Sequence, residues 1–141
     1  MVPILRAGLG MVDGMVALMP NVKVGHIGLY RDPNTLEPVK YYFKMPPDIE
    51  ERDAIIVDPM LATGSSIVLA HEALCEHGGT PKHTHITAVV ASEEGVDYVK
   101  RHMSPKTTTI WCGAVDEELT SKSYIVPGLG DAGDLAYGEK L

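Results

Sequence analysis

Short apolar runs alternate along the chain with amphipathic stretches. The apolar runs predict strands at residues 2–5, 22–30, 54–57, 85–91 and 107–112. Helical spacing of apolar side chains, followed in two cases by proline or glycine, predicts helices at residues 11–19, 65–77 and 93–102. This alternation predicts an α/β fold, in which an open, mainly parallel sheet carries helices on its faces.

Two segments lack the alternation. Residues 31–48 contain four prolines and no lasting periodicity, which indicates a long mobile loop or a hairpin. The tail at 124–138 is rich in glycine. Because ligands of open α/β sheets bind at the carboxyl ends of the strands, we expect the functional residues directly after the apolar runs.

Composition narrows the function. The chain has 141 residues, the size of one domain, which we predict to span 1–141. The chain has a net charge of −7, and it lacks the basic stripe that is typical of a nucleic-acid-binding protein. It holds no apolar stretch of about 18 uncharged residues, so we expect no membrane span and a cytoplasmic location.

The cysteines and histidines suggest no metal centre. Cys75 and Cys112 lie far apart and predict neither a disulfide framework nor a zinc site. His83 and His85 fall on one face of a strand, but no third ligand follows at a suitable interval. The simpler interpretation is a pair of exposed histidines at a strand entrance.

The sharpest motif runs from the buried strand 54–57 to Ser66. Asp58 ends the strand, where it could accept hydrogen bonds from sugar hydroxyls or hold a metal-bound water. Thr63, Ser65 and Ser66 then offer hydroxyls at the start of a helix, where free N–H groups favour a phosphate. The alternative is that these hydroxyls merely cap the helix.

Four segments of the chain together resemble one family. They are 4–10, with Arg6 before a glycine-rich turn, the pair Tyr30-Arg31, the loop 58–66, and the tail 124–134. In this order they are similar to the motifs of the uracil phosphoribosyltransferases, a branch of the type I phosphoribosyltransferases. The resemblance extends over residues 2–138, and it implies a sheet of the phosphoribosyltransferase type with a base-binding loop near the C-terminus.

The resemblance implies an enzyme of pyrimidine salvage that converts uracil and phosphoribosyl pyrophosphate (PRPP) to UMP and diphosphate. It implies catalytic roles for Asp58, Arg31 and Asp131. The implied PRPP contacts are Arg6, Ala7, Gly8, Arg31, Asp58, Pro59, Met60, Leu61, Ala62, Thr63, Gly64, Ser65, Ser66 and Asp131. The implied uracil contacts are Ile125, Gly130, Asp131 and Ala132.

The same resemblance implies Mg²⁺ as a cofactor that reaches the site on PRPP, without a direct protein ligand. It also implies assembly into a homo-oligomer and GTP as an effector, and neither nucleic acid nor membrane as a partner.

The chain departs from the family pattern at several points. It begins at the first family motif, without the N-terminal segment that precedes it in the family, which predicts a fragment, an alternative start or a reduced homologue. Leu135 stands where a basic residue is usual, Ser65 where glycine is usual, and the sequence at 92–95 differs. Two alternatives to the enzyme therefore stay open, a regulator that binds PRPP or a nucleotide without turnover and an inactive truncated homologue.

Overall fold

The computed structural model describes residues 1–35 and 38–139, with residue 31 described by its backbone alone. A seven-stranded sheet has the strand order β3-β2-β1-β4-β6-β5, and β7 pairs with the free side of β6. All pairings are parallel except that of β3 with β2. The strands are β1 (Val2–Leu5), β2 (His26–Arg31), β3 (Pro38–Lys44), β4 (Asp53–Val57), β5 (Met60–Leu61), β6 (His83–Ser92) and β7 (Thr108–Asp116). The predicted open, mainly parallel sheet is confirmed.

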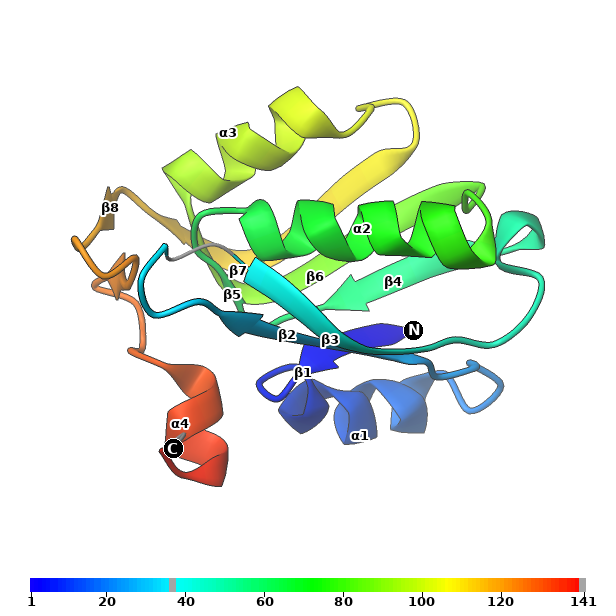
Figure 1. Ribbon diagram of the computed structural model, residues 1–141, viewed down its shortest axis with the longest axis horizontal. Helices are drawn as coiled ribbons and strands as arrows, with labels where there is room; N and C mark the ends of the chain where they lie inside the picture. The colour runs from blue at the N-terminus through cyan, green and yellow to red at the C-terminus, as the bar shows by residue number, and fades with distance from the viewer. Residues whose placement is uncertain (36–37, 140–141) are drawn as a thin grey trace.

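Helices cover both faces of this sheet (Figure 1). One face carries α1 (Leu9–Leu18), and the other carries α2 (Ser65–Gly78) and α3 (Glu93–His102). The core lies between the sheet and α2, where Ile56, Ile86 and Leu74 are fully buried. All three belong to one cluster of buried apolar side chains. The burial of such side chains between helix and sheet stabilises an α/β fold.

The strand and helix predictions hold with shifted ends. The predicted strand 22–30 begins only at His26, because residues 19–25 form a turn in which the Val22 N–H donates to the Met19 carbonyl. The strand predicted at 107–112 extends to Asp116, since β6 offers pairing partners as far as Ser92. Of the two interpretations of 31–48, the hairpin is correct: β3 pairs with β2 from Pro38 to Lys44.

Several short elements have no counterpart in the predictions. They are the 3₁₀ turn η1 (Ile49–Glu51), the strand β5, the two-stranded hairpin of β8 (Glu118–Leu119) and β9 (Ile125–Val126), and the helix α4 (Ala132–Tyr137). β5 lies in the loop 58–66, and β9 and α4 lie in the glycine-rich tail. Residues of β5, of the turn between β8 and β9 and of α4 line a cavity at the carboxyl end of the sheet, where we expected the functional residues.

His83 and His85 are half-buried rather than exposed, which corrects the expectation. Their rings lie 4.6 Å apart on one face of β6. Neighbouring side chains of β7 cover them: His83 Nε2 lies 2.8 Å from Thr109 Oγ1, and Trp111 Nε1 donates to His85 Nδ1 at 3.1 Å. Among the described residues, no three His, Cys, Asp or Glu side chains gather into a metal-binding group.

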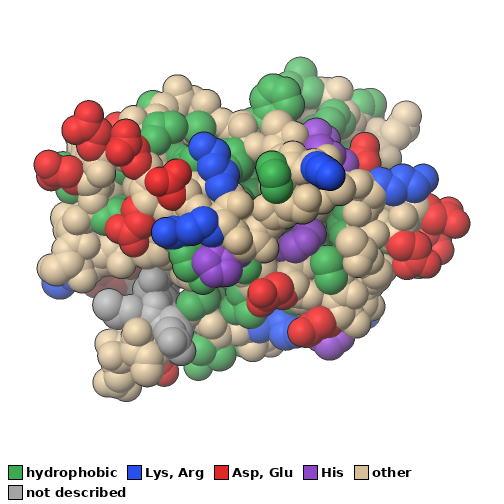
Figure 2. Space-filling model, turned by 90° about the horizontal axis from the view of Figure 1, so that it is seen from above, with side chains coloured by type: hydrophobic (Ala, Val, Ile, Leu, Met, Phe, Trp, Pro, Cys, Tyr) green, Lys and Arg blue, Asp and Glu red, His purple; other side chains and the backbone are tan. Residues whose placement is uncertain are grey.

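The face that α2 and α3 cover has a mixed charge. Figure 2 shows acidic side chains gathered toward its two ends, with Lys and Arg side chains scattered between them.

Across residues 1–35 and 38–139, none of the helices is long and apolar enough to cross a bilayer.

Candidate active site

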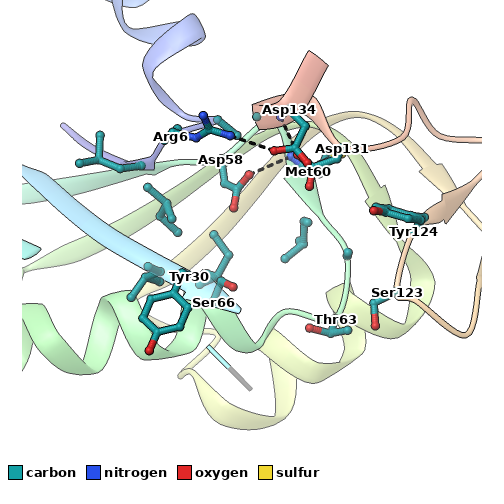
Figure 3. A pocket seen from close by; sticks show the side chains of 18 of the residues that line it. Arg6, Tyr30, Asp58, Met60, Thr63, Ser66, Ser123, Tyr124, Asp131 and Asp134 are labelled. Atoms are coloured by element: carbon teal, nitrogen blue, oxygen red, sulfur yellow. Dashed lines mark hydrogen bonds and ion pairs between the residues drawn. The ribbon is translucent and has the colours of Figure 1, made fainter. Parts of the chain in front are cut away.

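A cavity of about 1070 Å³ opens at the carboxyl ends of the strands. Five segments line it: the turn after β1, the end of β2 with part of the adjoining hairpin, the loop after β4, the turn between β8 and β9, and the tail before and within α4. Figure 3 shows that they point side chains into one space from different parts of the chain.

The turn after β1 is built around a tightly packed glycine. The Gly8 N–H donates to the Ile4 carbonyl at 2.9 Å, and a Cβ at Gly8 would fall 2.5 Å from the Val57 oxygen. Only glycine therefore allows the turn to pack against β4. Arg6 and Ala7, the half-buried residues that precede Gly8 in this turn, line the cavity.

The loop after β4 fixes a carboxylate at the end of a buried strand. The Asp58 N–H donates to the Thr87 carbonyl at 3.1 Å, and the Asp58 carboxylate accepts from the Met60 N–H, also at 3.1 Å. Met60 and Leu61 then form β5 by pairing with β6. This backbone network holds Asp58 half-buried at the edge of the cavity.

The loop ends at the start of α2, where a phosphate group would find hydrogen-bond donors. Gly64 is the N-cap residue, with a positive φ of 82°. Gly64 has no side chain with which to cap, and the hydroxyl that caps the helix is that of Thr63, which accepts from the Ser65 N–H at 3.5 Å. Thr63 Oγ1 and Ser65 Oγ lie 2.8 Å apart, and the Thr63 and Ser66 side chains line the cavity. Together with the free N–H groups of the first helical turn, these hydroxyls suit phosphate oxygens.

The tail returns to the turn after β1. Asp131 is the N-cap residue of α4, and its carboxylate accepts from the Asp134 N–H at 2.9 Å. Asp134 in turn accepts from Arg6 Nη2 at 2.8 Å, and the same nitrogen donates to the Gly138 carbonyl at 2.9 Å. The tail is thus bound directly to the first turn, and both carboxylates line the cavity.

The hairpin of β2 and β3 forms a further wall. Tyr30 and Tyr41 line the cavity with their rings 6.2 Å apart. Beside them, Asp32 accepts hydrogen bonds from the backbone N–H groups of Thr35 and Asn34, at 3.0 and 2.8 Å. These bonds, led by the one from Thr35, lower the pKa of Asp32 below its usual value.

The cavity gathers most of the residues predicted to bind PRPP. Those that line it are Arg6, Ala7, Asp58, Met60, Leu61, Ala62, Thr63, Gly64, Ser66 and Asp131. Gly8 and Pro59 are buried beside the cavity, and the Ser65 hydroxyl forms a hydrogen bond with the Thr63 hydroxyl. The Arg31 side chain lies outside the described residues. Their roles in binding PRPP stay predictions.

Only one of the four predicted uracil contacts lines the cavity. Asp131 lines the cavity, whereas Ile125 is buried in β9, and Gly130 and Ala132 flank Asp131 without lining the cavity themselves. Sequence reasoning missed several lining residues, namely Tyr30, Asp32, Tyr41, Lys122, Ser123, Tyr124, Gly133 and Asp134. Of these, Lys122 and Ser123 directly precede the tail motif 124–134, and that position was the available signal.

The fold defines a class of proteins. A purine phosphoribosyltransferase from Pyrococcus horikoshii aligns with a TM-score of 0.55 at 16% identity, over 84% of this chain and 78% of that one. A hypoxanthine-guanine phosphoribosyltransferase from Bacillus anthracis aligns with a TM-score of 0.58 at 12% identity, over 84% of this chain and 65% of that one. At such identities the likeness shows the fold alone, which is that of the phosphoribosyltransferases.

The sequence identifies the branch. The family model of uracil phosphoribosyltransferase matches residues 1–139, and the chain belongs to this family. A uracil phosphoribosyltransferase of Bacillus velezensis is 57% identical over 139 residues, which cover 99% of this chain and 65% of that protein. A solved protein of Aquifex aeolicus is 39% identical with a TM-score of 0.89, over 97% of this chain and 64% of that one. The chain thus spans 65% of the length of the curated relative from Bacillus velezensis.

Proposed function

We propose that the chain is an enzyme of pyrimidine salvage, which transfers the phosphoribosyl group of PRPP to N1 of uracil and releases UMP and diphosphate. One observation carries the proposal: the first turn, the loop 58–66 and the tail line a single cavity although they lie far apart in the sequence. These are the segments whose chemistry suits pyrophosphate, ribose 5-phosphate and a base.

The loop 58–66 would bind the ribose 5-phosphate. Its hydroxyls at Thr63 and Ser66 and the N–H groups at the start of α2 suit the 5′-phosphate. Asp58, at the other end of the loop, would accept hydrogen bonds from the ribose hydroxyls. The spacing is supported by β5, which holds the two ends of the loop apart.

The pyrophosphate would bind at the first turn. Arg6 uses Nη2 for the tail, and its guanidinium has further N–H donors suited to phosphate oxygens. The buried Gly8 keeps the backbone of the turn close to the cavity. We propose Arg31 as a second pyrophosphate ligand from the family motif alone.

Uracil would bind against the tail. Uracil presents an acceptor at O4 and a donor at N3, and cytosine reverses both. Backbone groups at Ile125, Gly130 and Ala132, fixed in direction by the fold, would leave cytosine with unpaired buried groups and so reject it. The tail is held by a hydrogen bond from the Gly128 N–H to Asp116 Oδ2 at 3.0 Å, which supports a fixed pocket.

In the reaction, the bond between ribose C1 and the pyrophosphate oxygen breaks with its electron pair passing to pyrophosphate. The bond from uracil N1 to C1 forms, and the N1 proton passes to solvent. Positive charge develops on the ribose ring, where the Asp58 and Asp131 carboxylates would stabilise it. Arg6 would stabilise the negative charge of the leaving group.

Mg²⁺ fits this cavity as an ion carried by PRPP, whose phosphates would hold it without a direct protein ligand. The carboxylates of Asp58 and Asp131 line the cavity and give it a negative charge that suits a cation brought in by the substrate. When bound, the ion would neutralise charge on the leaving pyrophosphate.

The wall made by Tyr30 and Tyr41 would help to keep water, which hydrolyses PRPP, out of the cavity.

We also propose that the protein is cytoplasmic, forms a homo-oligomer and has GTP as an effector. This part of the proposal rests on family membership alone.

The test is UMP formation by the purified, folded chain from uracil, PRPP and Mg²⁺, with cytosine as the control base. The proposal predicts UMP from uracil and no CMP from cytosine. Binding of PRPP without turnover would indicate a regulator instead. A folded chain that neither turns over nor binds PRPP would contradict the proposal.

A further inference from the structure

The turn between β8 and β9 brings a lysine to the cavity. Lys122 and Ser123 line it together with Tyr124, although both lie before the tail motif 124–134. In Figure 3 the hydroxyls of Ser123 and Thr63 lie toward one end of the cavity, and Arg6 lies toward the other.

Three hydrogen bonds fix this turn. The Ser123 N–H donates to the Thr120 carbonyl at 2.8 Å, and the Thr120 N–H donates to the Tyr124 carbonyl at 2.8 Å. The Tyr124 N–H donates to the Thr120 hydroxyl at 3.1 Å. Ser123 has a positive φ of 63°, as is typical of the last residue in a three-residue hairpin loop. Lys122 therefore projects from a defined backbone.

The charged side chains around the cavity indicate that Lys122 pairs with a bound anion. Four carboxylates line it, namely Asp32, Asp58, Asp131 and Asp134. The cations among the described lining side chains are Arg6 and Lys122. Arg6 already binds Asp134, whereas Lys122 forms no ion pair within residues 1–35 and 38–139. A cation stabilises a bound phosphate group, and Arg6 lies at the end of the cavity away from the hydroxyls of Thr63 and Ser123.

We infer that Lys122 is a substrate-binding residue, whose ammonium group pairs with the 5′-phosphate of PRPP and of UMP. It would reach the phosphate site from the turn between β8 and β9, whereas the hydroxyls and N–H groups of that site come from the start of α2. This inference rests on the proposed function, because it takes the 5′-phosphate to lie at Thr63 and Ser66. A lysine suits the task, since its three N–H donors on a flexible stem reach a phosphate as a point charge.

The test compares Lys122→Gln and Lys122→Arg with Lys106→Gln, which removes the same charge at an exposed position that does not line the cavity. Loss of one charge-assisted hydrogen bond should raise the KM for PRPP and the Kd for UMP about five- to tenfold. The kcat should stay within about twofold, because the contact is present in substrate and transition state alike. Binding of pyrophosphate alone should not change, and Lys122→Arg should recover most of the affinity.

Two results would overturn the inference while UMP formation stands. Lys122→Gln could have the same KM for PRPP and the same Kd for UMP as Lys106→Gln, which would make Lys122 a solvated surface residue. Alternatively, pyrophosphate binding could weaken as much as UMP binding. That result would indicate a long-range electrostatic effect of the lost charge and no contact with the 5′-phosphate.

Calorimetry with UMP separates this inference from the proposed function. If the unmodified chain binds UMP but makes none, the proposed function fails, and weaker UMP binding by Lys122→Gln would still support the lysine contact. If the unmodified chain does not bind UMP, both fail.

Discussion

Arg6 and Asp134 form an ion pair of 2.8 Å between residues that are 128 positions apart. Through it the turn after β1 is bound to α4, so the proposed pyrophosphate site and the proposed base site share one contact. Both side chains are about one-third exposed, so the pair contributes at most about 1 kcal/mol to stability. Its importance therefore lies in geometry more than in stability.

Arg6→Gln and Asp134→Asn should separate the two tasks of this contact. Both remove the ion pair, but only Arg6→Gln removes a cation from the proposed pyrophosphate site. We expect Arg6→Gln to raise the KM for PRPP by about tenfold or more and Asp134→Asn to change it much less. Steady-state kinetics measure the difference. Equal effects would mean that Arg6 serves only to hold the tail.

Asp58→Asn should reduce kcat by about 100-fold with little effect on folding. The asparagine oxygen can still accept from the Met60 N–H, so the loop keeps its hydrogen bond, while the negative charge that would stabilise the ribose cation is lost. Asp53→Asn, at the exposed start of the same strand, is the matched control and should retain activity. Full activity of Asp58→Asn would contradict the proposed role of the carboxylate.

The sequence allowed prediction of the elements whose pattern is local. The buried run at 54–57 and the period of 93–102 each identify their element, because burial of those side chains follows from their own order. β5 could not be predicted, since a two-residue strand shows no period and exists through its pairing with Val90 and Ala91.

The site was predictable only as far as its motifs extend. Asp58 and Thr63 follow a recognisable strand, whereas the approach of Asp134 to Arg6 depends on tertiary packing across the whole chain. Lys122 belongs to no motif, and its one signal in the sequence is its position directly before the tail 124–134. Its place at the cavity follows from the hairpin of β8 and β9, which is too short to predict.

Gly8→Ala should destabilise the fold by about 1–3 kcal/mol, because the new methyl group would overlap backbone atoms that cannot move away. Its Cβ would lie 2.5 Å from the Val57 oxygen and 2.8 Å from the Ile4 nitrogen. Gly14→Ala is the control: it lies within α1 with no atom within 4 Å of the added Cβ, and should stabilise by about 0.5–1 kcal/mol. Urea unfolding measures both. Equal stabilities would contradict the close packing of the first turn.

His71 should make the stability of the fold depend on pH. Its ring lies on α2 with Nδ1 3.3 Å from the hydroxyl of the buried Thr84 and Nε2 3.6 Å from the Cys75 sulfur. Burial lowers the pKa of His71 below its ordinary value of 6.5, against an opposing effect of Glu72. As pH falls through 6.5, the unfolded chain therefore takes up a proton before the folded chain does.

The free energy of unfolding should accordingly fall as pH decreases through 6.5, and this contribution should level off once pH lies below the pKa of the folded state. His71→Gln keeps hydrogen-bonding capacity toward Thr84 but cannot titrate, so it should flatten this part of the stability profile. Urea unfolding at a series of pH values from about 7.5 to 5.5 measures the slope on either side of the ordinary histidine pKa. An unchanged slope in His71→Gln would assign the pH dependence to a group other than His71.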